Sequence, residues 1–245
     1  MANWSDPQGQ TTAFGRTGTV DAATDAGLRS YMLSVYNYMA SGVLLTGIVA
    51  MLFARTDFAQ AMAAGQGGIL TWVVMLAPLA FVMVLSFGIN RLSTAAAQAL
   101  FWVFAGVMGL SMSTIFLRFT GESIATAFFA TTAAFVGLSL YGYTTKRNLS
   151  AMGTFLIMGL VGIIVAMVLN MLIFQSSAMA LVISILGVLI FAGLTAYDTQ
   201  MVKETYYRVA GTDFMGKAII LGALNLYLDF VNMFTFLLNI LGSRE

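Results

Sequence analysis

Long apolar stretches recur along nearly the whole chain and are separated by short polar segments. A helix of about 18 or more apolar residues is long enough to cross a hydrocarbon core about 30 Å thick. Hydropathy predicts seven such spans, at residues 31–54, 69–90, 95–117, 123–143, 151–174, 177–201 and 217–241. Stretches of this length indicate helices and not a barrel. We therefore expect an all-α polytopic membrane protein.

Composition limits both the class of protein and its chemistry. Of 245 residues, 60% are hydrophobic and 9% are charged, whereas about a quarter are charged in ordinary soluble domains. Cys and His are absent, which excludes disulfides, thiol nucleophiles, imidazole bases and the usual zinc ligands. The net charge of +1 comes without a basic patch, so nucleic acid is not an expected partner. No cofactor is expected to be required.

The polar amino terminus differs from the rest of the chain. Residues 1–28 are small, polar and rich in Gly and Thr, and they contain no apolar core of a signal peptide. We expect these residues to form a disordered tail and residues 29–245 to form one transmembrane domain of seven helices. The loops are too short for a soluble domain, so the function should belong to the bundle, which sits in the lipid bilayer, or to its partners in the membrane.

The basic residues predict an orientation. An odd number of spans puts the two termini on opposite sides of the membrane. With the amino terminus inside, eight basic residues are cytoplasmic and three are outside: Arg16, Arg29, Arg91, Lys146, Arg147, Lys203, Arg208 and Lys217 against Arg55, Arg118 and Arg244. The positive-inside rule favours this orientation. The short tail without a presequence favours a bacterial inner membrane.

Asp229 lies deep in the last apolar span. It follows Lys217 by twelve residues and precedes Arg244 by fifteen, so it is about 18 Å along the helix from the nearer basic residue. An ionised carboxylate at such a depth costs about 2.5–3.5 kcal/mol on insertion scales. A part in an ion or proton path is the default hypothesis for such a residue.

Asparagines share the helix face of Asp229. Asn225, Asp229, Asn232 and Asn239 recur at spacings that place them on one side of a helix. A polar face in a membrane must contact protein or water. The asparagines could therefore form hydrogen bonds between helices, each worth about 1 kcal/mol or less, or Asn225 and Asn232 could line a polar path.

A second carboxyl group, that of Asp198, lies near the predicted cytoplasmic end of the sixth span. It could be a cap or pair with Lys203, five residues later. Alternatively, the sixth and seventh spans are antiparallel neighbours, joined by a loop of about fifteen residues, and Asp198 and Asp229 come to similar heights. Two carboxylates in one low-dielectric pocket cannot both ionise without a large cost and should titrate as a unit. The pair could thus sense pH without histidine.

The two protonation states of such a pair have different consequences. When both groups are ionised, Asp198 and Asp229, with Asn225, Asn232 and backbone carbonyls, form an oxygen-rich site suited to a calcium ion. When one group is protonated, the two can share the proton and hold the sixth and seventh helices together.

Three motifs carry a family resemblance: "SLYGYTTKRNLSAMG" at 139–153, "FAGLTAYDTQMVK" at 191–203 and "LNLYLDFVNMFTFLLNILG" at 224–242. Through them the chain resembles the Bax inhibitor-1 family over residues 29–245. The resemblance implies seven helices with the last one central. It also implies a pH-sensitive calcium leak channel, in which the aspartates matching Asp198 and Asp229 sense protons. A basic residue near the end of the second span helps to hold the closed state in such channels, and Arg91 in "FGINRLST" is the candidate here.

Two other classes compete with the leak channel. Some bacterial relatives are associated with a membrane-anchored ATP-dependent protease, so the alternative is a non-transporting regulator of such a protease or of a stress pathway. An intramembrane aspartyl protease also carries "YD" on its sixth helix. However, its Gly-x-Gly-Asp motif is missing here, and its Pro-Ala-Leu segment cannot exist because the prolines are at positions 7 and 78. We therefore expect no enzyme.

Overall fold

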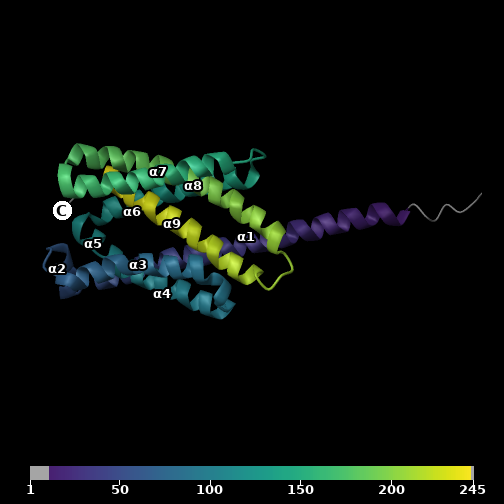
Figure 1. The fold of residues 1–245 in the computed structure, drawn as a ribbon, viewed down its shortest axis with the longest axis horizontal. Helices are drawn as coiled ribbons and strands as arrows, with labels where there is room; N and C mark the ends of the chain where they lie inside the picture. The colour runs from purple at the N-terminus through teal and green to yellow at the C-terminus, as the bar shows by residue number, and fades with distance from the viewer. Residues whose placement is uncertain (1–10, 244–245) are drawn as a thin grey trace, which may run out of the picture.

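The computed structural model describes residues 11–243, with side chains placed from residue 25 onward. Every regular element in this part of the chain is a helix (Figure 1). The long helices are α1 (Thr11–Phe53), α3 (Gly68–Gly88), α4 (Thr94–Met112), α6 (Gly121–Thr144), α7 (Ser150–Leu169), α8 (Ser177–Val209) and α9 (Met215–Leu241). The short ones are α2 (Asp57–Ala63), η2 (Ile89–Arg91), α5 (Ile115–Arg118) and η3 (Asn170–Phe174).

Seven helical stretches among the described residues are long and apolar enough to cross a membrane. They are Asp25–Phe53, Gly68–Arg91, Thr94–Leu117, Gly121–Thr144, Ser150–Phe174, Ser177–Val209 and Met215–Leu241. Each coincides with one of the seven spans predicted from hydropathy. The predicted fold class, an all-α polytopic membrane protein, is confirmed.

Helix α9 occupies the centre of the bundle. It packs against α1, α4, α6 and α8, and in Figure 1 it runs obliquely between the group formed by α1, α3 and α4 and the group formed by α6, α7 and α8. Two-thirds of its apolar window is buried (67%), whereas no other span exceeds 33%. The other helices turn apolar side chains outward, as expected for a surface that faces lipid. The predicted central position of the last helix is confirmed.

A hydrogen-bonded contact joins α1, α4 and α9. The Thr46 hydroxyl donates to the carbonyl of Ala105 at 2.8 Å, so the fully buried Tyr227 donates its own hydroxyl proton to Thr46, at 2.6 Å. Gly109 lets α4 approach α1 closely, because a Cβ there would lie 2.7 Å from the carbonyl oxygen of Thr46. A small residue, Gly109, and two hydrogen-bonded hydroxyl groups, those of Thr46 and Tyr227, thus allow three helices to pack closely in the apolar interior.

The boundaries of two segments differ from the sequence expectation. Residues 1–10 of the expected disordered tail lie outside the described part of the chain, and the helical backbone of α1 already begins at Thr11. In Figure 1 this end of α1 extends beyond the other helices. A helix nucleated in the first span can continue through polar residues that lack proline, because each added residue gains one hydrogen bond. The domain division at residue 28 stays a prediction.

The loop between the sixth and seventh spans is shorter than expected. The predicted length of about fifteen residues is wrong, because α8 continues to Val209 and the connection is residues 210–214. Residues 201–209 contain neither Gly nor Pro, so nothing stops the helix there. It ends before Gly211, which has a positive φ of 77°, the backbone conformation with which helices commonly terminate. Asp198 consequently lies well inside α8.

Candidate functional site

The two aspartates meet where α8 packs against α9. Their carboxyl groups are within hydrogen-bonding reach of each other. Asp229 is 3% exposed, and Asp198 is partly buried. A carboxylate has no proton to donate, so a hydrogen bond between two carboxyl groups requires that one of them is protonated. The structure therefore brings together the two residues that the sequence predicts as a proton-sharing pair.

Within the described residues, the pair has no positive partner to offset its charge. Oδ2 of Asp229 is buried and has no hydrogen-bond partner among the described residues. No lysine or arginine in residues 25–243 forms an ion pair with either carboxyl group. A buried carboxylate without a partner is costly, and an unsatisfied buried oxygen calls for an explanation. A bound proton or a bound cation would each remove the cost.

Lys203, the other candidate partner for Asp198, makes different contacts. Its Nζ donates to the carbonyl of Tyr143 at 2.8 Å and lies 4.9 Å from the centre of the Tyr143 ring. Tyr143 belongs to the last turn of α6, where a cation stabilises the helix dipole. Asp198 is also not a cap, since it lies in the interior of α8. Neither structural alternative for Asp198 is present in the described residues.

Close contacts with α6 and α7 hold the Asp198 segment of α8 in place. Gly142 in α6 lies directly against the backbone of Ala196, and a Cβ on Gly153 in α7 would overlap the ring of Tyr197.

Gln200 fixes the loop between α6 and α7, because its Oε1 accepts from the backbone N–H of Leu149 and its Nε2 donates to the carbonyl of Arg147, both at 2.8 Å. Sequence reasoning missed these roles, although the motif at 139–153 contains both glycines.

Replacing Gly142 by Val is expected to destabilise the protein by about 1–3 kcal/mol, the usual cost of overpacking a close contact. The added side chain would meet the Ala196 backbone and push α8 away from α6. The measurement is the thermal unfolding of the purified protein in detergent. Gly137→Val is the matched control, because a Cβ at this exposed position of the same helix meets nothing within 4 Å. Equal melting temperatures for the two variants would contradict the prediction.

The asparagines of α9 are less buried than Asp229. Asn225 and Asn239 are exposed and Asn232 is partly buried. The amide of Asn232 donates to the carbonyl of Leu228 at 2.8 Å, and Asn239 likewise bonds to its own helix. The expected hydrogen bonds between helices do not occur for these amides among the described residues. Oδ1 of Asn232 is left available for a cation, and a path along Asn225 and Asn232 stays a prediction.

Arg91 lies at the end of the second span. It is the last residue of the short helix η2, and its side chain is exposed. The guanidinium forms no ion pair within residues 25–243. Nothing in this conformation joins Arg91 to the aspartates, and its part as a latch stays a prediction.

An apolar layer closes the interior between the pair and the connection at residues 210–214. Val202 follows Asp198 by one turn of α8, and Gly222 precedes Asp229 by two turns of α9. A Cβ on Gly222 would lie 3.0 Å from Val202 and 3.4 Å from Val35 of α1. Aromatic rings lie one turn further on, where Tyr31 and Tyr206 are 5.4 Å apart between ring centres. The pair is thus sealed from this end of the bundle.

This arrangement defines a class of membrane protein: a bundle of seven spanning helices around a central last helix, with two carboxyl groups in contact inside it. The chain belongs to the Bax inhibitor-1 family, since the family model described as "Inhibitor of apoptosis-promoting Bax1" matches residues 28–245. The family inferred from the three motifs is confirmed.

Relatives in several bacteria are similar to the chain over almost its whole length. A protein of Rickettsia prowazekii is 43% identical over 90% of this chain and 92% of its own. The inner membrane protein YbhL of Escherichia coli is 42% identical over 90% and 94%, and a membrane protein of Streptococcus pyogenes is 34% identical over 91% and 96%. Together with the seven apolar helices, these likenesses show an integral membrane protein.

Proposed function

We propose that this protein is a pH-sensitive leak channel for calcium, gated by the pair Asp198 and Asp229. The observation that carries the proposal is the contact between two carboxyl groups inside the bundle without a basic partner. While the groups share a proton, the hydrogen bond ties α8 to α9. When both are ionised, they repel each other and present anionic oxygens to a cation. The pair binds and releases ions in this scheme and catalyses no reaction.

The number of ligands suits passage of an ion better than its storage. Calcium takes six to eight oxygen ligands, whereas no group of three or more Asp, Glu, His or Cys that could hold a metal occurs in the described part of the chain. Asp198 and Asp229 would supply two carboxylates, and Oδ1 of Asn232, backbone carbonyls and water would supply the rest. Conduction requires binding weak enough for the ion to leave, and a site with two carboxylates meets this condition.

We propose the orientation with the amino terminus in the cytoplasm of a bacterial cell and the carboxyl terminus outside its inner membrane. The connection at residues 210–214 then lies on the cytoplasmic side, between Arg208 of α8 and Lys217 of α9. This placement follows the positive-inside rule. The apolar layer of Val35, Val202 and Gly222 would then separate the aspartates from the cytoplasm.

Calcium flux into proteoliposomes of the purified protein, measured at about pH 6, 7 and 8, tests the proposal. The expected result is flux above that of empty liposomes that changes with pH across this range. No flux from folded protein would overturn the leak. That result would favour the non-transporting regulator, and the next step would be to test co-purification with a membrane-anchored ATP-dependent protease.

Arg91→Ala is expected to raise the resting flux, because in the proposed mechanism the cation at the end of η2 stabilises the closed state. An exposed ion pair is worth about 0.2–1 kcal/mol, so the flux should rise by a factor of about 1.4 to 5. Arg118→Ala is the matched control, since Arg118 is also an exposed arginine that ends a short helix. Unchanged flux at both acidic and alkaline pH would remove Arg91 from the mechanism.

A further inference from the structure

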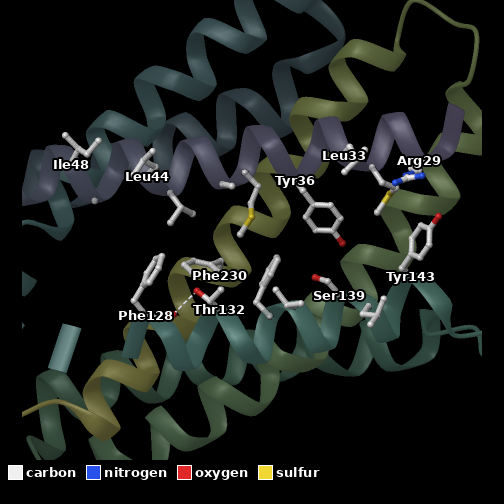
Figure 2. A pocket seen from close by; sticks show the side chains of 18 of the residues that line it. Arg29, Leu33, Tyr36, Leu44, Ile48, Phe128, Thr132, Ser139, Tyr143 and Phe230 are labelled. Carbon is white, nitrogen blue, oxygen red and sulfur yellow. Dashed lines mark hydrogen bonds between the residues drawn. The ribbon is translucent and has the colours of Figure 1, made fainter. Parts of the chain in front are cut away.

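A large groove lies between α1 and α6. Its volume is about 1010 Å³, and Phe230 of α9 forms part of its wall (Figure 2). Several apolar side chains along it are more than half exposed: Leu33 (53%) and Leu44 (65%) from α1, and Val136 (60%) and Leu140 (62%) from α6. Both helices span the membrane, so the groove opens sideways toward lipid.

Most of the polar groups of the groove lie toward one end. Figure 2 shows Arg29, Tyr36, Ser139 and Tyr143 toward one end, with the apolar Leu33 beside Arg29, whereas Leu44, Ile48 and Phe128 lie toward the opposite end, where Thr132 is the polar residue labelled. None of the described residues that line the groove is acidic, and Arg29 forms no ion pair within residues 25–243.

A second cation adds to the positive charge of this end. Nζ of Lys203 lies 4.9 Å from the centre of the Tyr143 ring, and its single described hydrogen bond, to the carbonyl of Tyr143, leaves further N–H donors available. Lys203 does not itself line the groove, so the polar end combines the Arg29 cation with two tyrosine hydroxyls, and Lys203 adds positive charge beside Tyr143. Such a group of donors matches a phosphate in charge and in hydrogen bonding.

The groove is long enough to hold a lipid chain. The lining residues of α1 run from Arg29 to Met51, which is about 33 Å of helix at 1.5 Å per residue. One leaflet contributes about half of a hydrocarbon core that is about 30 Å thick. An acyl chain that starts at Arg29 therefore reaches about as far as Ala40 and stays within the groove.

We propose that this groove is a binding site for an anionic phospholipid of the leaflet on the Arg29 side. The phosphate lies beside Arg29, and the hydroxyls of Tyr36 and Tyr143 donate hydrogen bonds to it, with Lys203 near enough to add to the positive charge. One acyl chain lies between α1 and α6. Unlike a lipid of the bilayer at large, this one is selected by its charge as well as by its chain. The site does not depend on whether the protein transports calcium.

The test is the binding of added phosphatidylglycerol and phosphatidylcholine with the same acyl chains to the purified, detergent-solubilised protein, measured by native mass spectrometry. Phosphatidylglycerol is expected to bind more tightly, and Arg29→Gln is expected to lower its affinity by about 1.4- to five-fold, the range of a single exposed ion pair. Phosphatidylcholine should respond less to this change. Arg208→Gln is the control, because this exposed arginine does not line the groove.

A second variant tests the position of the acyl chain. Ala40→Trp places an indole in the path of the chain, since Ala40 is exposed and lines the groove, and should weaken the binding of both lipids. Three results would overturn the proposal: equal affinity of the wild type for the two lipids, an affinity for phosphatidylglycerol that Arg29→Gln leaves unchanged, or unchanged binding in Ala40→Trp. Each variant is first shown to be monodisperse by size-exclusion chromatography, so a loss of binding is not a loss of fold.

Discussion

Replacing either Asp198 or Asp229 by Asn is expected to make calcium flux independent of pH between about pH 6 and 8. Asn has the shape of Asp and can still form a hydrogen bond across the contact of α8 with α9, but it cannot ionise. Each variant therefore retains one carboxyl group and never carries the two like charges that repel. Its flux should stay, at every pH, at the level of the wild type when the aspartates share one proton.

The measurement is the proteoliposome flux at about pH 6, 7 and 8 for the wild type and both variants, each reconstituted from a monodisperse preparation. Asn239→Ala is the matched control on the same helix, because Asn239 is exposed and its amide bonds to the carbonyl of Thr235 one turn away. This control should keep the pH profile of the wild type. If both aspartate variants kept the wild-type dependence of flux on pH, the gating mechanism would be wrong, even if their absolute flux differed from that of the wild type.

Features that depend on one helix at a time could be predicted from the sequence. The seven spans follow from hydropathy alone, because a helix in lipid satisfies its own backbone and needs only sufficient apolar length. The depth of Asp229 follows from its distance to Lys217 along one helix. The contact of Asp229 with Asp198 was one of two alternatives left open for Asp198, because adjacent antiparallel spans could carry the two residues at similar heights.

Features that depend on contacts between distant segments could not be predicted. Gly142 has a role only because the backbone of Ala196 lies against it, and no local pattern contains that contact. The same is true of Lys203, which is close to Asp198 in sequence but bonds to Tyr143, sixty residues earlier. The end of α8 was misplaced because hydropathy falls after residue 201, whereas a helix stops only where its backbone geometry changes, here before Gly211.

Val202→Ala is expected to raise the calcium flux about ten-fold at every pH. Val202 packs with Val35 in the layer that closes the interior on the side of residues 210–214, and both side chains are almost fully buried. Burying one CH₂ group is worth about 0.8 kcal/mol, so removing two carbon atoms weakens the closed layer by about 1.6 kcal/mol, on the order of ten-fold in an equilibrium constant. Hydrophobic constrictions of this kind gate channels by excluding water.

The control and the double variant separate this barrier from the aspartate pair. Val182→Ala removes the same atoms from an exposed valine of the same helix, which is 54% exposed, and should leave the flux unchanged. Val202→Ala combined with Asp229→Asn should give a flux that is both high and independent of pH, because the variants act on two different elements. Unchanged flux in Val202→Ala would mean that ions do not cross this layer. If Val202→Ala alone made the flux independent of pH, the apolar layer and the aspartate pair would not act separately. The proposed path of calcium through the bundle would then be wrong.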